Sequence, residues 1–270
     1  MNSSLFIRLA CFTLTIGSVI AQQNAQQAAA PPRAARVGYL SPADSPDFSR
    51  IVPAAPTAGD SRDALDLSIF RATRSLEGSP RWALALSDND VSTAGLFKAF
   101  SCSLGVELTR DNAPLVTALV TKLTADSGNA LTRLKQLNQQ RKRPFMVAEG
   151  PICLPSRASL DGNPDYPSGH STSGWTVGLV LAEMAPDAAS AILSRARAIG
   201  ESRVVCGVHN ASAIDAGFMT ASAVVAALHG SAAFRADMGA ARSELAAARA
   251  HVSGGAGCAL EAEILATRPY

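Results

Sequence analysis

The apolar residues of this chain recur along most of its length with the period of an α-helix. Leucines are spaced by four residues over 115–123 and by three over 131–137. The same pattern returns at 171–185, 187–200, 212–228 and 233–250. β-branched runs that alternate with period two are almost absent, and the sequence shows no fixed repeat and no sustained heptad. We therefore predict an all-α fold, built as a single compact helical domain.

Composition sets limits on what such a domain can do. The chain has 270 residues, of which 47% are hydrophobic and 17% charged, so it can bury a sizeable core and is not expected to be disordered. Lys and Arg together number 24 against 22 Asp and Glu, without a block of like charge. Nucleic-acid binders use a broad positive field, and this balance does not supply one.

The first residues have the pattern of a secretory signal. Arg8 precedes an apolar run, and a small residue, Ala21, precedes the polar stretch QQNAQQ. A membrane anchor is the alternative, but the run of about 13 apolar residues falls short of the ~20 that span a bilayer. The run at 216–228 is equally short and contains Thr220 and Ser222. We predict a signal peptide over 1–21, a periplasmic mature protein and no membrane span.

The rest of the chain divides by composition. Residues 22–60 are rich in Pro, Ala and Gln and are predicted to form a leader and an extended arm. The helical domain should occupy 61–250 and a glycine-rich, then briefly helical tail 251–270. Cleavage would remove Cys11 and leave an even number of cysteines, Cys102, Cys153, Cys206 and Cys258. In an exported protein this favours two disulfides, and the count alone leaves all three pairings open.

One of three short segments that could carry chemistry is 165–171, DYPSGHS. Ser168 stands before an apolar periodic run as a natural helix N-cap, and a helix N-terminus offers free N–H groups to an anion such as phosphate. Gly169 would let the backbone come close, and His170 could donate a proton. An ordinary capped helix start with an incidental histidine is the alternative.

The other two segments add arginines and a second histidine. Arg143 follows the long helical stretch, and Arg203 precedes His209 by six residues. Arginine matches phosphate oxygens with a planar fork of donors, and a histidine beside it can attack phosphorus. A surface salt bridge is the commoner role for one arginine alone. Two arginines, two histidines and a helix N-terminus together indicate a phosphoryl-transfer site.

These blocks resemble those of a known family. The motifs Arg143-Pro144, Pro167-Ser168-Gly169-His170 and Ser202-Arg203-x5-His209 are similar to the signature of the class A non-specific acid phosphatases. That family belongs to a superfamily with the type 2 phosphatidic acid phosphatases and the vanadium haloperoxidases. Flanking residues such as Tyr166, Trp175 and Cys206-Gly207 agree, and a weaker likeness extends over 39–248.

The resemblance implies a helical, secreted phosphomonoesterase that uses neither metal nor cofactor and acts on small phosphate monoesters at acid pH. His209 would be the nucleophile that forms a phosphohistidine, and His170 the general acid. The phosphate would be held by Arg143, Arg203, Ser168 and the N–H of Gly169. The sequence leaves the oligomeric state open, a homo-oligomer included.

Two positions depart from the family pattern. Gln136 stands where the family has a lysine, although Lys135 is adjacent and could serve through a helix bulge or its long side chain. Ala213 stands where the family has an aspartate that orients the nucleophile. On a helix continuing from His209, Asp215 would face elsewhere. Loss of such a carboxylate costs about 10⁴ in rate in the serine-protease template, so a weakly active enzyme is one expectation.

Several alternatives follow. The chain could be a non-catalytic phosphate-binding relative, or a vanadate-dependent haloperoxidase with the same cradle. A serine nucleophile elbow at 169–173 is rejected, because DGNPDYP before it is no strand.

Cys153 and Cys206 both flank the proposed site, so we expect them to pair, which leaves Cys102 with Cys258. The residues expected outside the site are His229, His251, Trp82 and Trp175.

Overall fold

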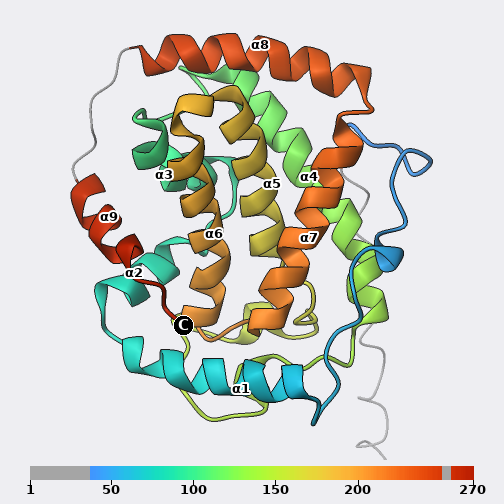
Figure 1. Ribbon diagram of the computed structural model, residues 1–270, viewed down its shortest axis with the longest axis vertical. Helices are drawn as coiled ribbons and strands as arrows, with labels where there is room; N and C mark the ends of the chain where they lie inside the picture. Colours follow the sequence, from blue (N-terminus) through green and yellow to red (C-terminus); the bar gives the residue numbers. More distant parts are fainter. Residues whose placement is uncertain (1–36, 251–256) are drawn as a thin grey trace, which may run out of the picture. The chain divides into compact units, whose positions relative to one another are not determined.

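Three helices form the centre of the structure, a computed structural model that describes residues 37–250 and 257–270. They are α5 (Gly169–Met184), α6 (Ala189–Val205) and α7 (Ala211–Leu228), which lie side by side in Figure 1, with α5 packed extensively against both neighbours. The predicted all-α class is confirmed, since the described ranges hold helices and turns and no strand.

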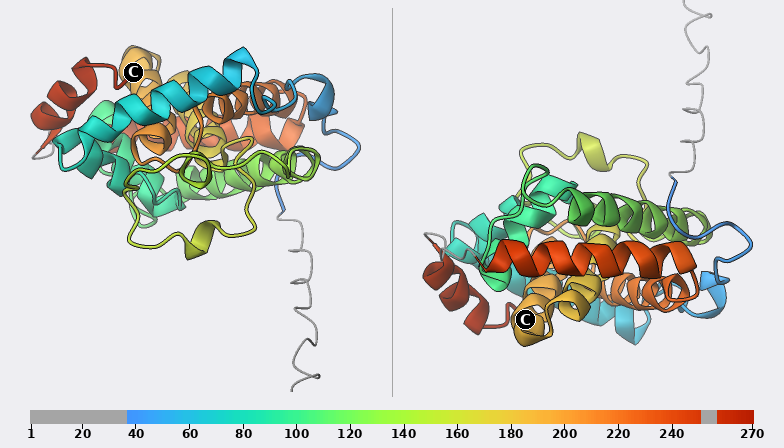
Figure 2. Two further views of the ribbon diagram at one scale, coloured as in Figure 1. Left: turned by 90° about the horizontal axis from the view of Figure 1, so that it is seen from below. Right: turned by 90° about the horizontal axis from the view of Figure 1, so that it is seen from above.

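The other helices cover this centre. The longest, α4 (Pro114–Leu137), packs on α5, α7 and α8 (Ala232–Arg249), and α8 crosses one end of the central helices (Figures 1 and 2). At the opposite end lies α1 (Ser61–Thr73). The remaining α-helices are α2 (Pro80–Ser87), α3 (Thr93–Leu104) and α9 (Cys258–Ala266). Short 3-10 turns occur at Phe48–Arg50, Arg74–Leu76, Pro144–Met146, Ala158–Leu160 and Pro186–Ala188.

Two of the central helices, α5 and α6, approach closely at a glycine. A Cβ on Gly178 of α5 would lie 2.4 Å from the Cβ of Ala196 on α6, closer than two non-bonded carbon atoms can approach. The core continues on both sides of this contact with large, fully buried side chains, including Phe100, Leu181 and Ile192. Close packing here fixes the axial position of α5 against α6. The candidate site lies where α5 begins and α6 ends.

α6 is longer than its sequence pattern predicted. The apolar periodicity ends near residue 200, yet the helix continues to Val205. Its last turns bury polar side chains, among them Glu201, Ser202 and Arg203. Buried polar residues do not register in an apolar pattern, so the sequence placed a break where the helix continues.

Two of the remaining predictions fall on elements that the structure describes. Both disulfides have the predicted partners, Cys102 with Cys258 and Cys153 with Cys206. α7 is long and apolar enough to cross a membrane by length and composition, but 56% of it is buried inside the protein, as in a core helix. The predicted signal peptide, residues 22–36 of the predicted leader and arm, and His251 lie outside the described residues.

Candidate active site

The turn that follows α6 brings His209 back beneath Arg203. The amides of Val208 and His209 both donate to the carbonyl of Arg203, at 3.1 and 3.3 Å. Gly207 makes this turn with a φ of 78°, and a Cβ there would lie 2.6 Å from Nη1 of Arg74. The five-residue spacing between Arg203 and His209 is therefore the length of one tight turn that needs glycine.

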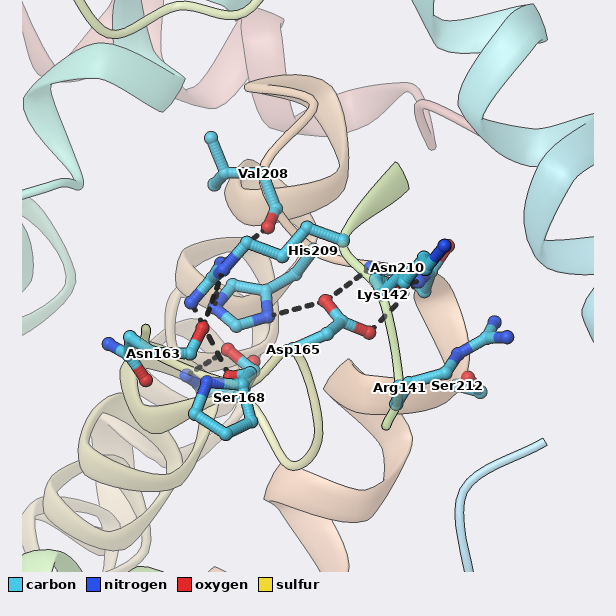
Figure 3. A network of polar contacts seen from close by, with 12 residues as sticks. Arg141, Lys142, Asn163, Asp165, Ser168, Val208, His209, Asn210 and Ser212 are labelled. Carbon is cyan, nitrogen blue, oxygen red and sulfur yellow. Dashed lines mark hydrogen bonds and ion pairs between the residues drawn. The ribbon is translucent and has the colours of Figure 1, made fainter. Parts of the chain in front are cut away.

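His209 is buried and has a partner on each ring nitrogen (Figure 3). Its Nδ1 lies 3.0 Å from Oδ1 of Asp165, and its Nε2 lies 3.3 Å from Nη1 of Arg143. A guanidinium only donates, so Nε2 is the nitrogen without a proton and Nδ1 carries one. Burial lowers the pKa of His209 well below its usual range, and the charges of Arg143, Lys135 and Arg203 lower it further. The ring is thus neutral, with a lone pair available on Nε2.

Arg143 is held by carbonyl groups of two other segments. Its Nε donates to the carbonyl of Asn163 at 3.0 Å, and its Nη1 donates to that of Val208 at 2.6 Å. Burial lowers the pKa of Arg143, while the charge of Asp165 opposes that shift. These contacts direct one edge of the guanidinium toward His209 without neutralising its charge.

Arg203 is completely buried, yet two of its guanidinium nitrogens have no hydrogen-bond partner. The unpartnered atoms are Nε and Nη1. Burial and the charge of Arg143 lower the pKa of Arg203 to about 9, with Asp88 acting in the opposite direction. A buried, unsatisfied cation is costly unless a ligand completes it. Two arginines whose charges act on one another indicate that the missing partner is an anion.

The N-terminus of α5 contributes the second part of the site. Ser168 caps the helix, and its Oγ accepts from the amide of Ser171 at 3.4 Å. Its own amide donates to the carbonyl of Ala213 at 2.9 Å, which attaches this helix start to α7. Gly169 and His170 open the first turn, where N–H groups have no acceptor within the helix. This end of α5 is therefore suited to an anion.

His170 is fixed by the loop between α2 and α3. Its Nε2 lies 3.0 Å from the carbonyl oxygen of Asn89, so Nε2 carries a proton and donates it. Burial lowers the pKa of His170 well below its usual range, with further lowering by Arg203, His209 and Arg143. The neighbouring Asp88 is itself anchored to α6, because it pairs with Arg195 at 2.5 Å and accepts from Ser202 at 2.6 Å.

Lys135 reaches the site, whereas Gln136 is exposed. Its Nζ donates to Oδ1 of Asn163 at 2.6 Å and to the carbonyl of Pro164 at 3.1 Å. Burial, together with the charge of Arg143, lowers the pKa of Lys135 to about 8. α4 is α-helical throughout its range, so the long side chain rather than a bulge provides the reach.

All seven predicted site residues lie in this one region, and the structure adds Asp165, which sequence analysis did not select. It belongs to the segment DYPSGHS, but no local signal linked it to His209, 44 residues away. The premise used for Asp215 was wrong: α7 begins at Ala211, so no helix continues from His209. Asp215 is nevertheless exposed.

Comparisons with known proteins show the family to which the chain belongs. A family model described as the PAP2 superfamily matches residues 114–236, which include all seven predicted site residues. The chain is 44% identical to an acid phosphatase of Zymomonas mobilis subsp. mobilis over 195 residues, 72% of this chain and 74% of that protein. It is 33% identical to a non-specific acid phosphatase of Providencia stuartii over 209 residues, 77% of this chain and 84% of the relative. The resemblance seen in the sequence motifs is confirmed, and the chain belongs to the acid phosphatases of the PAP2 superfamily.

Proposed function

We propose that the protein hydrolyses small phosphate monoesters through a phosphohistidine on His209. The observation that carries this proposal is the buried guanidinium of Arg203, whose Nε and Nη1 lack partners beside a neutral histidine. Arg143, Lys135 and the α5 N-terminus at Ser168 and Gly169 would hold the remaining phosphate oxygens. Phosphoryl transfer depends mainly on such positioning and charge stabilisation.

In the first step, the lone pair of His209 Nε2 attacks phosphorus and the bond from phosphorus to the ester oxygen breaks. His170 protonates the leaving alkoxide. Because a carbonyl oxygen only accepts, the Nε2 proton of His170 remains in its hydrogen bond to Asn89. The charge of the bound phosphate would favour a second proton, on Nδ1, and this is the proton that passes to the alkoxide and leaves His170 neutral. In the second step, neutral His170 takes a proton from water, the water oxygen attacks phosphorus, and the bond to His209 breaks.

The test is release of p-nitrophenol from its phosphate ester between about pH 4 and about pH 8, a range that covers a histidine acid. His209→Ala should abolish release, and a phosphoenzyme stable to alkali should be labelled at His209 in the original protein only. His229→Ala is the control, since His229 lies on the exposed surface beside Glu183.

Two other outcomes would contradict the proposal. Phosphate binding without any release, unchanged in His209→Ala, would indicate a non-catalytic phosphate-binding protein. Halide oxidation that depends on added vanadate, without phosphatase activity, would indicate a haloperoxidase.

The proposed location is the periplasm, reached through cleavage after Ala21, with α7 as a core helix and no membrane span. Fractionation of cells and N-terminal sequencing of the mature protein would test this. A protein retained in the membrane fraction with residues 1–21 intact would contradict it. Nothing in the charge balance suggests a nucleic-acid partner.

A further inference from the structure

The carboxylate that contacts His209 comes from an unexpected segment. Position 213 on α7 holds a buried alanine, whose methyl group cannot accept a hydrogen bond. Asp165 lies in the loop that leads into α5, and its Oδ1 is 3.0 Å from Nδ1 of His209. This carboxylate has no exposed surface, so its interaction with the ring is not weakened by water.

Asn210 holds Asp165 in this orientation from both sides. Its backbone amide donates to Oδ1 at 3.2 Å, and its side-chain Nδ2 donates to Oδ2 at 2.9 Å (Figure 3). The same Nδ2 also donates to the carbonyl of Lys142 at 3.1 Å, which restrains the amide itself. Both oxygens of Asp165 therefore act as acceptors, as the ionised form requires. Burial raises the pKa of Asp165 to about 6, against the lowering effect of its hydrogen bond from Asn210, so above that pH the proton between Asp165 and His209 belongs to the ring.

We propose that Asp165, held by Asn210, is the positioning residue for His209 and takes the place of a carboxylate at position 213. The inference rests on the proposed phosphatase function. Its hydrogen bond keeps the proton on Nδ1, so that Nε2 presents a lone pair toward the phosphate site. When Nε2 bonds to phosphorus the ring becomes cationic, and the adjacent carboxylate stabilises that charge.

This assignment links three functions within one short segment. Asp165 precedes the helix cap Ser168 by three residues and the proposed acid His170 by five. The segment 165–170 would thus orient the nucleophile, bind phosphate and protonate the leaving group. A carboxylate on α7 would instead orient the nucleophile independently of the α5 N-terminus.

The first experiment is Asp165→Asn, which keeps the size of the side chain and removes its charge. We expect kcat to fall by about 10²-fold or more, with KM within about threefold, because the phosphate ligands remain. Asp215→Asn is the matched control, an exposed aspartate on α7, and should leave kcat unchanged. If Asp165→Asn keeps its kcat, or loses activity only through KM, the proposal is overturned.

The second experiment moves the carboxylate. Asp165→Ala should lose at least as much kcat as Asp165→Asn, and adding Ala213→Asp should recover about tenfold or more. A folded double variant no more active than Asp165→Ala would overturn the claim that the two positions are equivalent.

A spectroscopic measurement separates this inference from the proposed function. In ¹⁵N-labelled protein, the Nδ1 proton of His209 should resonate far downfield because a carboxylate accepts it, and Asp165→Asn should move it upfield. An unchanged resonance would overturn the role of Asp165 even in an active enzyme. If the unmodified chain shows no turnover, the proposed function fails, and this resonance still tests the positioning of His209.

Discussion

At the scale of single residues, the site is a set of buried charges that are incompletely paired. Arg203 has two guanidinium nitrogens without a partner, and its neighbour Arg143 carries the same charge. The folded protein therefore pays a desolvation cost that only a bound anion removes. This explains why the residues that bind phosphate need not stabilise the empty protein.

Arg203→Met provides a direct check of that cost. We expect the free energy of unfolding in urea without phosphate to stay constant or to rise by about 1–3 kcal/mol, because an unpaired buried cation is replaced by an apolar side chain. Phosphate at about 100 times its Kd should add ~2.7 kcal/mol to the original protein and almost nothing to the variant. Arg197→Met, which removes a partly exposed cation paired with Glu201 on α6, should keep the phosphate effect. An equal phosphate effect in both variants would contradict the assignment of Arg203.

His170 should respond to phosphate in its pKa. Burial and the charges of Arg203 and Arg143 lower that pKa in the empty site and so favour the neutral ring. A bound phosphate dianion opposes those charges and should raise the pKa of His170, which allows the ring to hold the proton that it donates. NMR titration with and without phosphate measures this change. A pKa of His170 that does not rise would exclude it as the general acid.

At the scale of elements, α6 shows how a helix can be both scaffold and site. Its middle turns pack against α5, where Ala196 faces Gly178, while its last turns carry buried polar residues. Arg74 donates to the carbonyls of Val204 and Val205 at 2.9 and 2.7 Å and thereby caps the C-terminal end. The position of Arg203 thus depends on contacts in the middle of the helix and at its C-terminal end.

Gly178→Ala should show that the helix contact outweighs helix propensity. Alanine favours a helix by up to about 1 kcal/mol over glycine, but the clash with Ala196 should make the variant less stable by about 1–3 kcal/mol. Gly239→Ala is the matched control, because Gly239 is exposed on α8 with no atom within 4 Å of an added Cβ. Urea unfolding of both variants gives the comparison, and stabilisation of Gly178→Ala would contradict the proposed close packing.

At the scale of the whole molecule, two disulfides join segments far apart in the chain. Cys102–Cys258 spans 156 residues and attaches α9 to α3, whereas Cys153–Cys206 spans 53 and fixes the end of α6. The amide of Cys153 also donates to the carbonyl of Cys206 at 2.9 Å, and Cys206 precedes His209 by three residues. The Cys102–Cys258 disulfide therefore supports a peripheral helix, and the Cys153–Cys206 disulfide supports the candidate active site.

Removing each bridge by paired Cys→Ala changes should separate these effects. Both variants should lose about 2–5 kcal/mol of unfolding free energy, because either long loop gains entropy in the unfolded chain. Only Cys153→Ala/Cys206→Ala should also lower kcat, because His209 loses its support. Urea unfolding and p-nitrophenyl phosphate hydrolysis on the same samples test this. A larger loss of kcat in Cys102→Ala/Cys258→Ala would contradict the division.

The sequence by itself determined the features that depend on residues close together in the chain. Helical periodicity predicted the fold class, and the spacing of Arg143, His170, Arg203 and His209 identified the family and the candidate site. It also identified Gln136 and Ala213 as departures. Such signals are readable because a helix period, a cap or a tight turn depends on residues within a few positions of one another.

Only the tertiary structure decided how those departures are accommodated. Lys135 reaches the site through its long side chain, and Asp165 contacts His209 across 44 residues. The continuation of α6 past residue 200 likewise depends on Asp88 and Arg81, which provide partners for its buried polar side chains. Each of these features requires groups that packing brings together from separate segments. A hydrogen bond between distant residues leaves no periodic trace in the sequence, because its geometry exists only once the helices are packed.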